Sequence, residues 1–400
     1  MRLQMWRASG LVLIAAALAG CGGGGGSGSS ATSGGAENPA AVVPASNTLE
    51  LTVERGFDNG STWYPNQPFV SIQVCQPDLS KCVTIDKVLV DTGSFGLRIF
   101  DTALAGITPT GVTHQGGELR QCAGFGSGYT LGRIVRIGLK MAGTQARDLP
   151  IQLIDSSAGT APSGCAAMGS AQFTNKEQVG GNAILGIGPL GSDVSSSLRV
   201  RYFTQVANQT NLLATVPENI AVPNPVTRLD QHNNGLVLQF PPVGLAGETT
   251  LKGTMTLGLN TANNNATSGV KFFGVSDAAR LRITLAGRSY NGLIDSGSNY
   301  YHFPSRYMAP CEGTIFFCPS KPETVPITIQ SWDLASSLNS ELLIDDYRNY
   351  NGMAAQPGLA GYDSGATELV LGLPYFYGRK VYVAIQGKGT ASVPAPAIGL

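Results

Sequence analysis

Two short segments of the chain each carry an aspartate in the same setting, and their residue types suit acid–base chemistry. Residues 88–94 read VLVDTGS, and residues 292–298 read GLIDSGS. In both segments, apolar β-forming residues run into the aspartate, and a turn with a glycine between two hydroxyl residues follows it. These hydroxyls can hydrogen-bond the carboxylate and hold its orientation. The copies lie 295 − 91 = 204 residues apart, which predicts two related halves that contribute Asp91 and Asp295.

Two carboxylates held a few ångströms apart can act as general base and general acid on one bound water. Both cannot ionise at low cost, so the pair is expected to share one proton and to titrate as a coupled unit. The ionised aspartate would take a proton from the water, which attacks an amide carbonyl. The protonated aspartate would hydrogen-bond that carbonyl and stabilise the developing oxyanion. Asp91 and Asp295 are therefore the candidate catalytic residues, and no covalent enzyme intermediate is needed.

Strands and turns, rather than helices, are expected to position these aspartates. The chain is low in charge (13%) and contains 52 glycines and 23 prolines. Short alternating apolar runs separated by turn residues dominate it, as in a mainly β protein. Helix-period stretches are predicted only over residues 193–210 and 331–339. Residues 125–132 read FGSGYTLG and precede an alternating run, which indicates a glycine-rich hairpin with a mobile tip.

Further motifs follow in an order that is similar to one known family. Residues 182–188 read NAILGIG, residues 235–240 and 253–258 read as paired strands, and residues 369–376 read LVLGLPYF. Together with the aspartate loops and the hairpin, this order resembles the pepsin-like bilobal aspartic peptidases over roughly residues 50–387. The resemblance implies a mainly β, two-lobed acid-protease double β-barrel with few short helices.

The resemblance also implies a lobe organisation and a role for each site residue. An N-terminal lobe over residues 48–230 would hold Asp91 and a flap hairpin, and a C-terminal lobe over residues 231–400 would hold Asp295. Hydroxyls at the second loop position would link the two loops, and those at the fourth position would bind the outer carboxylate oxygens. The supporting residues are Thr92, Gly93, Ser94, Ser296, Gly297 and Ser298. The flap residues are Phe125, Gly126, Ser127, Gly128 and Tyr129.

Two positions depart from the family pattern. Phe125 stands where the flap commonly has a tyrosine, so the hydroxyl near the catalytic water is missing unless Tyr129 replaces it. Arg98 stands where the family usually has an aromatic residue. An ordinary hairpin with no role in substrate binding is the alternative interpretation of the flap segment.

The N-terminus is predicted to be an export signal followed by a flexible tether. Residues 1–20 combine two arginines with a short apolar run, and small residues precede Cys21. This resembles the bacterial lipoprotein cleavage box, which implies lipidation of Cys21 and anchoring rather than spanning of the membrane. Glycine after the cysteine favours the outer membrane by the same resemblance. A plain secretory peptide is the alternative. Residues 21–47 are too polar and glycine-rich to order and should form the tether.

The remaining cysteines point to disulfides rather than metal. Six cysteines in an exported chain favour pairing, and two pairs are spaced by seven residues, which suits hairpin closure. The candidates are Cys75, Cys82, Cys122, Cys165, Cys311 and Cys318, with connectivity open. No metal is expected, because no CxxC occurs and the three histidines are scattered. No cofactor is expected either: residues 186–191 match GxGxxG only formally, without a surrounding βαβ pattern. Zero net charge argues against nucleic acid.

The sequence favours a lipid-anchored aspartic endopeptidase of the cell envelope, facing the periplasm or the cell surface. It is expected to be a monomer that binds peptide or protein substrates in the cleft between the lobes. The alternative is a catalytically inactive relative that binds peptide or glycan there. A different hydrolase or a structural envelope lipoprotein is the third interpretation. The chain resembles an uncharacterised bacterial lipoprotein family related to these peptidases.

Overall fold

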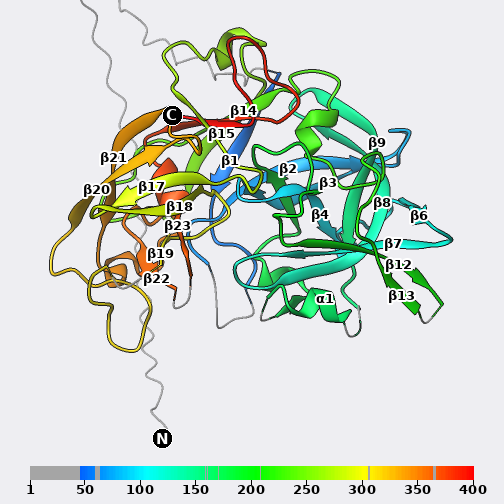
Figure 1. Cartoon of the computed structure of the whole chain (residues 1–400), viewed down its shortest axis with the longest axis horizontal. Coiled ribbons are helices and arrows are strands. Elements are labelled where there is room, and N and C mark those ends of the chain that lie inside the picture. Colours follow the sequence, from blue (N-terminus) through cyan, green and yellow to red (C-terminus); the bar gives the residue numbers. More distant parts are fainter. Residues whose placement is uncertain are drawn as a thin grey trace, which may run out of the picture. The chain divides into compact units, whose positions relative to one another are not determined.

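Figure 1 shows the computed structural model, which describes residues 46–58, 64–157, 159, 161–169, 171–207, 209–304, 307–363 and 366–400. The predicted export signal, Cys21 and nearly all of the predicted tether lie outside these residues. No helix in the described ranges is long and apolar enough to cross a bilayer. The described chain is almost entirely β-structure, as its alternating sequence runs predict.

Two sheets contain all the named strands of the described residues. The larger, 18-stranded sheet comprises β1 (Thr48–Val53), β2 (Pro68–Cys75), β3 (Cys82–Asp91), β4 (Phe95–Phe100), β5 (Thr110–Gly111), β6 (Thr113–His114), β7 (Gly117–Gly124), β8 (Tyr129–Met141), β9 (Thr144–Ile154), β10 (Gln172–Phe173), β11 (Ala183–Ile187), β12 (Val200–Val206), β13 (Gln209–Leu212), β14 (Gly235–Gln239), β15 (Leu251–Leu257), β16 (Phe272–Gly274), β24 (Lys380–Ala384) and β25 (Ala397–Gly399). The smaller, seven-stranded sheet comprises β17 (Leu281–Leu285), β18 (Arg288–Ile294), β19 (Tyr301–Phe303), β20 (Glu323–Gln330), β21 (Ser337–Ile344), β22 (Ala360–Tyr362) and β23 (Glu368–Leu371).

Helical structure in the described part of the chain is confined to single turns. The one α-helical turn is α1 (Ser163–Ala166). The 3₁₀ turns are η1 (Asp101–Ala103), η2 (Lys176–Gln178), η3 (Pro225–Arg228), η4 (Asn263–Asn265), η5 (Tyr347–Tyr350) and η6 (Leu373–Phe376). The few short helices that were predicted are therefore present, at other places than expected.

Both predicted helical stretches are wrong. Residues 193–210 form a loop and then β12, which pairs antiparallel with β7, because β-branched and aromatic residues there gain more from cross-strand packing. In the second stretch, residues 331–336 form a turn and residues 337–339 are the first residues of β21. In that turn the hydroxyl of Ser331 donates to Asp333, and the Asp333 carboxylate accepts from the backbone N–H of Ala335. Such local side-chain bonds compete with the helical backbone pattern.

The strand that ends at each aspartate is flanked in a similar way in the two halves. β11 runs parallel to β3, with Gly186 opposite Asp91, and antiparallel to β4. In the second half, β23 runs parallel to β18, with Leu371 opposite Ile294. A Cβ at Gly186 would lie 2.7 Å from the Phe95 backbone nitrogen, so glycine is needed where β11 threads past the Asp91 loop.

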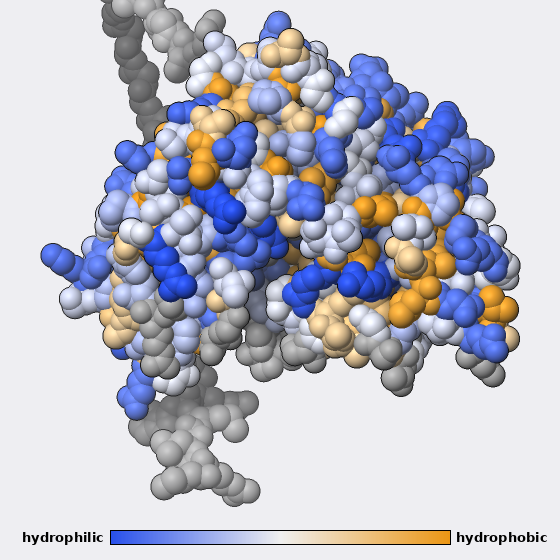
Figure 2. Space-filling model, in the orientation of Figure 1, coloured by the Kyte–Doolittle hydropathy of each residue, from blue (hydrophilic) through white to orange (hydrophobic). Residues whose placement is uncertain are grey.

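Strands from both ends of the chain share the larger sheet. β1 pairs antiparallel with β15, and β14 pairs with β24. Residue 230 is therefore not a boundary between the sheets, and the two-lobe division at that residue stays a prediction. One large apolar core includes Val90, next to Asp91, and Ile294, next to Asp295. On the face shown in Figure 2, polar and apolar side chains are interspersed, and apolar side chains gather most on the right of the view.

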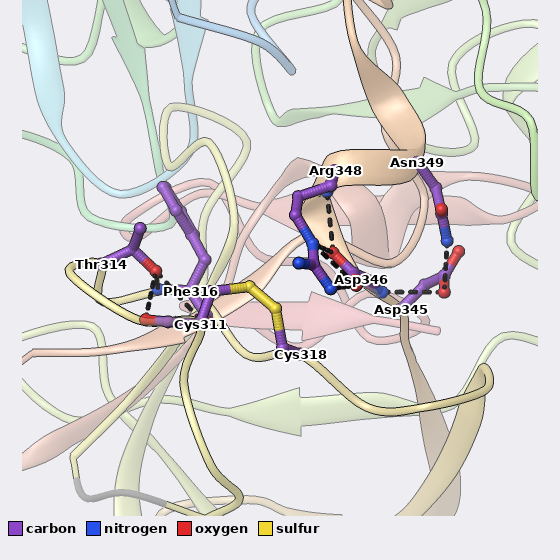
Figure 3. Close-up of a disulfide and its surroundings, with 8 residues drawn as sticks. All are labelled: Cys311, Thr314, Phe316, Cys318, Asp345, Asp346, Arg348 and Asn349. Atoms are coloured by element: carbon purple, nitrogen blue, oxygen red, sulfur yellow. Dashed lines mark hydrogen bonds and ion pairs between the residues drawn. A yellow bond between two sulfur atoms is a disulfide. The ribbon is translucent and has the colours of Figure 1, made fainter.

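Three disulfides link the six described cysteines. Cys75–Cys82 joins neighbouring strands β2 and β3, and Cys122–Cys165 joins β7 to α1. The third, Cys311–Cys318, lies close to Asp346, whose carboxylate is bound by Arg348 (Figure 3). The disulfide candidates are thus confirmed. Both thiols near Asp346 are consumed by the bridge, so this group offers no thiolate ligands.

Candidate active site

The two aspartate loops lie against each other. β3 ends at Asp91, and β18 ends one residue before Asp295. A Cβ added at Gly93 would lie 2.5 Å from the Asp295 carboxyl carbon, and one at Gly297 would lie 2.7 Å from that of Asp91. Each loop therefore uses its glycine to approach the carboxylate of the other loop. Fold topology thus brings together two aspartates that are 204 residues apart.

Each carboxylate is held by the same two hydrogen bonds within its own loop. Asp91 accepts from the Gly93 N–H at 2.8 Å and from the Ser94 hydroxyl at 2.5 Å. Asp295 has the equivalent partners, Gly297 N–H at 2.8 Å and Ser298 hydroxyl at 2.6 Å. Charge-assisted bonds of this kind fix the rotamer of a carboxylate. The predicted roles of the two serines agree with this geometry.

Reciprocal hydrogen bonds cross from one loop to the other. The Thr92 hydroxyl donates to the Ile294 carbonyl at 3.0 Å and accepts from the Ser296 N–H at 2.9 Å. The Ser296 hydroxyl donates to the Val90 carbonyl at 2.7 Å and accepts from the Thr92 N–H at 3.1 Å. Both side chains are fully buried, so water does not compete for these bonds. The four bonds fix the separation of the two carboxylates.

The electrostatics of the pair suit one shared proton. Burial, followed by the charge of Asp295 and a hydrogen bond with its carboxyl group, raises the pKa of Asp91 well above its usual value. The hydrogen bonds from Ser94 and Gly93 oppose this rise and do not cancel it. Asp91 is 6% exposed, which leaves it little solvation if ionised. The raised pKa of Asp91 therefore suits a pair that holds one proton between its two carboxyl groups.

The predicted flap is the hairpin of β7 and β8, with residues 125–128 at its tip. The Phe125 N–H donates to the Gly128 carbonyl at 2.7 Å and closes the turn, and Gly126 and Ser127 are exposed. Tyr129 does not restore the missing hydroxyl. Its ring is buried in a cluster with Cys122, and its OH lies 3.3 Å from the Gln172 side chain.

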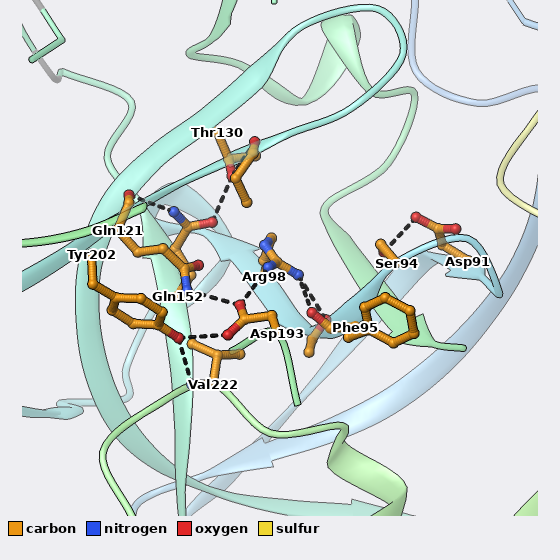
Figure 4. Close-up of polar contacts among 12 residues, drawn as sticks. Asp91, Ser94, Phe95, Arg98, Gln121, Thr130, Gln152, Asp193, Tyr202 and Val222 are labelled. Carbon is orange, nitrogen blue, oxygen red and sulfur yellow. Dashed lines mark hydrogen bonds and ion pairs between the residues drawn. The ribbon is translucent and has the colours of Figure 1, made fainter. Parts of the chain in front are cut away.

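A buried polar network that the sequence did not reveal lies behind the Asp91 loop (Figure 4). Arg98 is 1% exposed and donates to Asp193 at 2.8 Å. Asp193 also accepts from Gln121 at 2.8 Å and from the Tyr202 hydroxyl at 2.6 Å. Sequence reasoning noted Arg98 as a departure but placed Asp193 in a predicted helix, so the ion pair could not be inferred.

A second polar group follows the Asp295 loop. The His302 ring lies 2.6 Å from the Asp363 carboxylate, and the Tyr300 hydroxyl donates to the same carboxylate at 3.0 Å. The rings of Tyr300 and His302 stack with centroids 3.6 Å apart. Hydrogen bonding to His302 is the largest effect on Asp363 and lowers the pKa of its carboxyl group. No neighbouring residue in the sequence marks His302 as part of a polar group, because its partner Asp363 is 61 residues away.

Comparison with known proteins places the chain in a family. The family model described as "Protein of unknown function (DUF3443)" matches residues 43–399. The chain belongs to the DUF3443 family. A comparison with curated proteins finds no match for this DUF3443 protein.

Solved structures similar to this DUF3443 protein include the aspartic proteinase from Irpex lacteus. The match has a TM-score of 0.50 at 14% sequence identity and covers 88% of this chain and 96% of that chain. At this identity the likeness shows the fold alone. The predicted fold class, mainly β and similar to the aspartic proteinase fold, is confirmed.

Proposed function

We propose that this DUF3443 protein is an aspartic endopeptidase that uses Asp91 and Asp295 to activate a water molecule. The observation that carries the proposal is the pair of loops just described. Each presents one hydrogen-bonded carboxylate, and buried hydroxyls of Thr92 and Ser296 bind them together. A surface turn containing an aspartate does not need either the cross-loop bonds or the glycine contacts.

Because the two loops hold their carboxylates in the same way, the roles in this mechanism follow from which aspartate holds the shared proton. The ionised aspartate takes a proton from the water, and the water oxygen attacks the carbonyl carbon of the peptide bond. The protonated aspartate gives its proton to the carbonyl oxygen and stabilises the charge that develops there. The proton taken from the water then passes to the amine nitrogen as the carbon–nitrogen bond breaks. The other aspartate takes a proton back from the tetrahedral diol as it collapses to the carboxylic acid, so the cycle balances without a covalent intermediate.

The direct test is peptide cleavage by the full-length chain between pH 3 and pH 8. Asp91→Ala and Asp295→Ala should each lower the cleavage rate by at least about 1,000-fold, because each removes one half of the acid–base pair. Glu312→Ala, which removes an exposed carboxylate, is the matched control and should leave the rate unchanged. A folded wild type that cleaves no member of a diverse peptide library would refute the peptidase proposal.

One observation favours a second candidate, a non-catalytic protein that binds peptide or glycan at the dyad. Phe125 and Tyr129 offer no hydroxyl to the dyad, and Arg98 lies in the buried network behind it. If wild type is inert, equilibrium binding of an extended peptide should still be measurable. Asp91→Ala should then weaken that binding.

We further propose that the protein is exported and anchored by a lipid on Cys21, at the outer membrane, as a monomer that does not bind nucleic acid. Three disulfides support an oxidising compartment. Cells fed radiolabelled palmitate should label wild type and not Cys21→Ser; equal labelling would contradict the anchor.

A further inference from the structure

The guanidinium of Arg98 is a fixed point behind the Asp91 loop. It projects from β4, and one terminal nitrogen donates to the carbonyls of Phe95 at 2.6 Å and Gly96 at 3.3 Å. These carbonyls belong to the first two residues of β4, which begins directly after the Asp91 loop. The other terminal nitrogen donates to Asp193. The arginine is therefore bound at one end to the start of its own strand, next to the catalytic loop, and at the other to a buried carboxylate.

Strand β7 of the flap and its neighbour β12 hold Asp193 in turn. Gln121, four residues before the flap tip on β7, donates to Asp193, and Tyr202 lies opposite Gln121 in the ladder of β7 and β12. The Tyr202 hydroxyl donates to Asp193 and accepts from the Val222 N–H at 2.8 Å. Each oxygen of the carboxylate thus has a donor, as a buried anion requires.

The ring of Phe125, at the flap tip, lies over the same guanidinium. Its centroid is 5.8 Å from the central carbon of Arg98, within the range of a cation–π contact, and 6.1 Å from the Phe173 ring. The Arg98 Nε–H has no hydrogen-bond partner among the described residues. The electron-rich face of an aromatic ring can compensate a buried donor of this kind. The tip is also held by the Arg199 side chain, which donates to the Phe125 carbonyl at 3.1 Å, and by the Tyr129 N–H, which donates to the Ala171 carbonyl at 2.8 Å.

We propose that Arg98 is a positioning residue that holds the flap in a fixed place relative to the Asp91 loop, with Phe125 as its partner in the flap. The role in catalysis rests on the proposed peptidase function, but the positioning itself does not. The guanidinium binds the start of β4, which directly follows the Asp91 loop, through backbone carbonyls. It contacts the flap through the Phe125 ring and through Asp193 and Gln121.

Hydrogen exchange of the flap amides in the full-length chain tests this without any substrate. In Phe125→Leu, exchange of the segment 121–130 should be about 2- to 30-fold faster, the range that loss of one cation–π contact gives. Phe125→Tyr keeps the ring and is the matched control, with exchange expected to stay at the wild-type rate. Wild-type exchange in Phe125→Leu would overturn the proposal.

A double-mutant cycle separates the arginine contact from packing against Phe173. The pair Arg98→Met with Asp193→Asn removes both charges together, which buried pairs tolerate better than loss of one partner. In that background Phe125→Leu should change flap exchange by less than twofold. If its effect is instead as large as in wild type, the contact with Arg98 does not hold the flap.

Activity then distinguishes failure of this inference from failure of the proposed function. If the wild type cleaves peptides, Phe125→Leu should raise KM about 5- to 10-fold with kcat within about twofold, because the dyad itself is intact. An inert wild type whose flap loosens as predicted would refute the peptidase and leave the positioning role supported. An active wild type with unchanged flap exchange in Phe125→Leu would refute the positioning role alone.

Discussion

Glycine at positions 93 and 297 determines how close the two carboxylates lie. A side chain at either position would overlap the carboxylate of the opposite loop, at 2.5 Å and 2.7 Å respectively. Relief by a small shift is blocked, because Thr92 and Ser296 bond both loops across the interface. Substitution here must therefore either separate the aspartates or break those bonds.

Gly93→Ala is predicted to lower the free energy of unfolding by about 1–3 kcal/mol, the usual cost of overpacking a closed site. Peptide cleavage should fall about 100-fold or more, since displacement of about 1 Å at a reacting group has that effect. Gly126→Ala is the matched control, because a Cβ there meets no atom within 4 Å. Urea unfolding and cleavage rates measure both effects; a Gly93→Ala variant indistinguishable from Gly126→Ala would show that the loops can separate freely.

Among the structural elements, the network around Asp193 connects β4, β7 and β12 through charge. Burial raises the pKa of Asp193 to about 6, although Arg98, the Tyr202 hydroxyl and Gln121 all lower it. The folded state therefore binds a proton more tightly than the unfolded chain does. The resulting stability is fully present below the unfolded pKa of 3.8 and is lost as the pH rises through about 6.

Asp193→Asn is predicted to flatten this pH dependence. A pKa shift from 3.8 to about 6 corresponds to about 3 kcal/mol. Between pH 4 and pH 7.5, the free energy of unfolding of the wild type should therefore fall by about this amount more than that of Asp193→Asn. Asp333→Asn is the control. The hydrogen bond from Ser331 lowers the pKa of the exposed Asp333 carboxyl group, so this group titrates below the range from pH 4 to pH 7.5. Parallel pH profiles of the unfolding free energy for wild type and Asp193→Asn would show that Asp193 does not cause the pH dependence.

The elements also show what sequence can and cannot predict here. Both aspartate loops were predictable because strand, turn and hydroxyls are adjacent in sequence and occur twice. The partner of Arg98 was not, since Asp193 lies 95 residues away in a stretch whose apolar spacing also fits a helix. Phe125 could be recognised as a flap without a hydroxyl, but its position over Arg98 depends on how β4 and the hairpin pack. The sequence therefore predicts residues that act together within one short segment. It does not predict contacts between residues that are far apart in the chain.

For the described chain from residue 46 onward, the two aspartate-bearing halves are joined by more than the dyad loops. Asn66 is fully buried at a positive φ of 53° and donates to the carbonyls of Asn299 and Gln356. Its side-chain oxygen accepts from Tyr377 at 2.7 Å. One residue preceding β2 thus holds the end of the Asp295 loop.

Asn66→Ala is predicted to cost about 3–5 kcal/mol, because it leaves several buried donors and acceptors without partners. Asn260→Ala is the matched control: Asn260 has a similar φ of 54°, but it is exposed and water can replace its bonds to Thr267 and Ser392, so the substitution should cost about 1–2 kcal/mol. Unfolding of Asn66→Ala should nevertheless remain one transition in urea. The larger sheet contains strands from both ends of the chain, with β1 on β15 and β14 on β24, so the halves cannot unfold separately without breaking it. Two resolved transitions in Asn66→Ala would show that the shared sheet does not make the halves unfold together. Asn66 would then be the residue that couples them in the wild type.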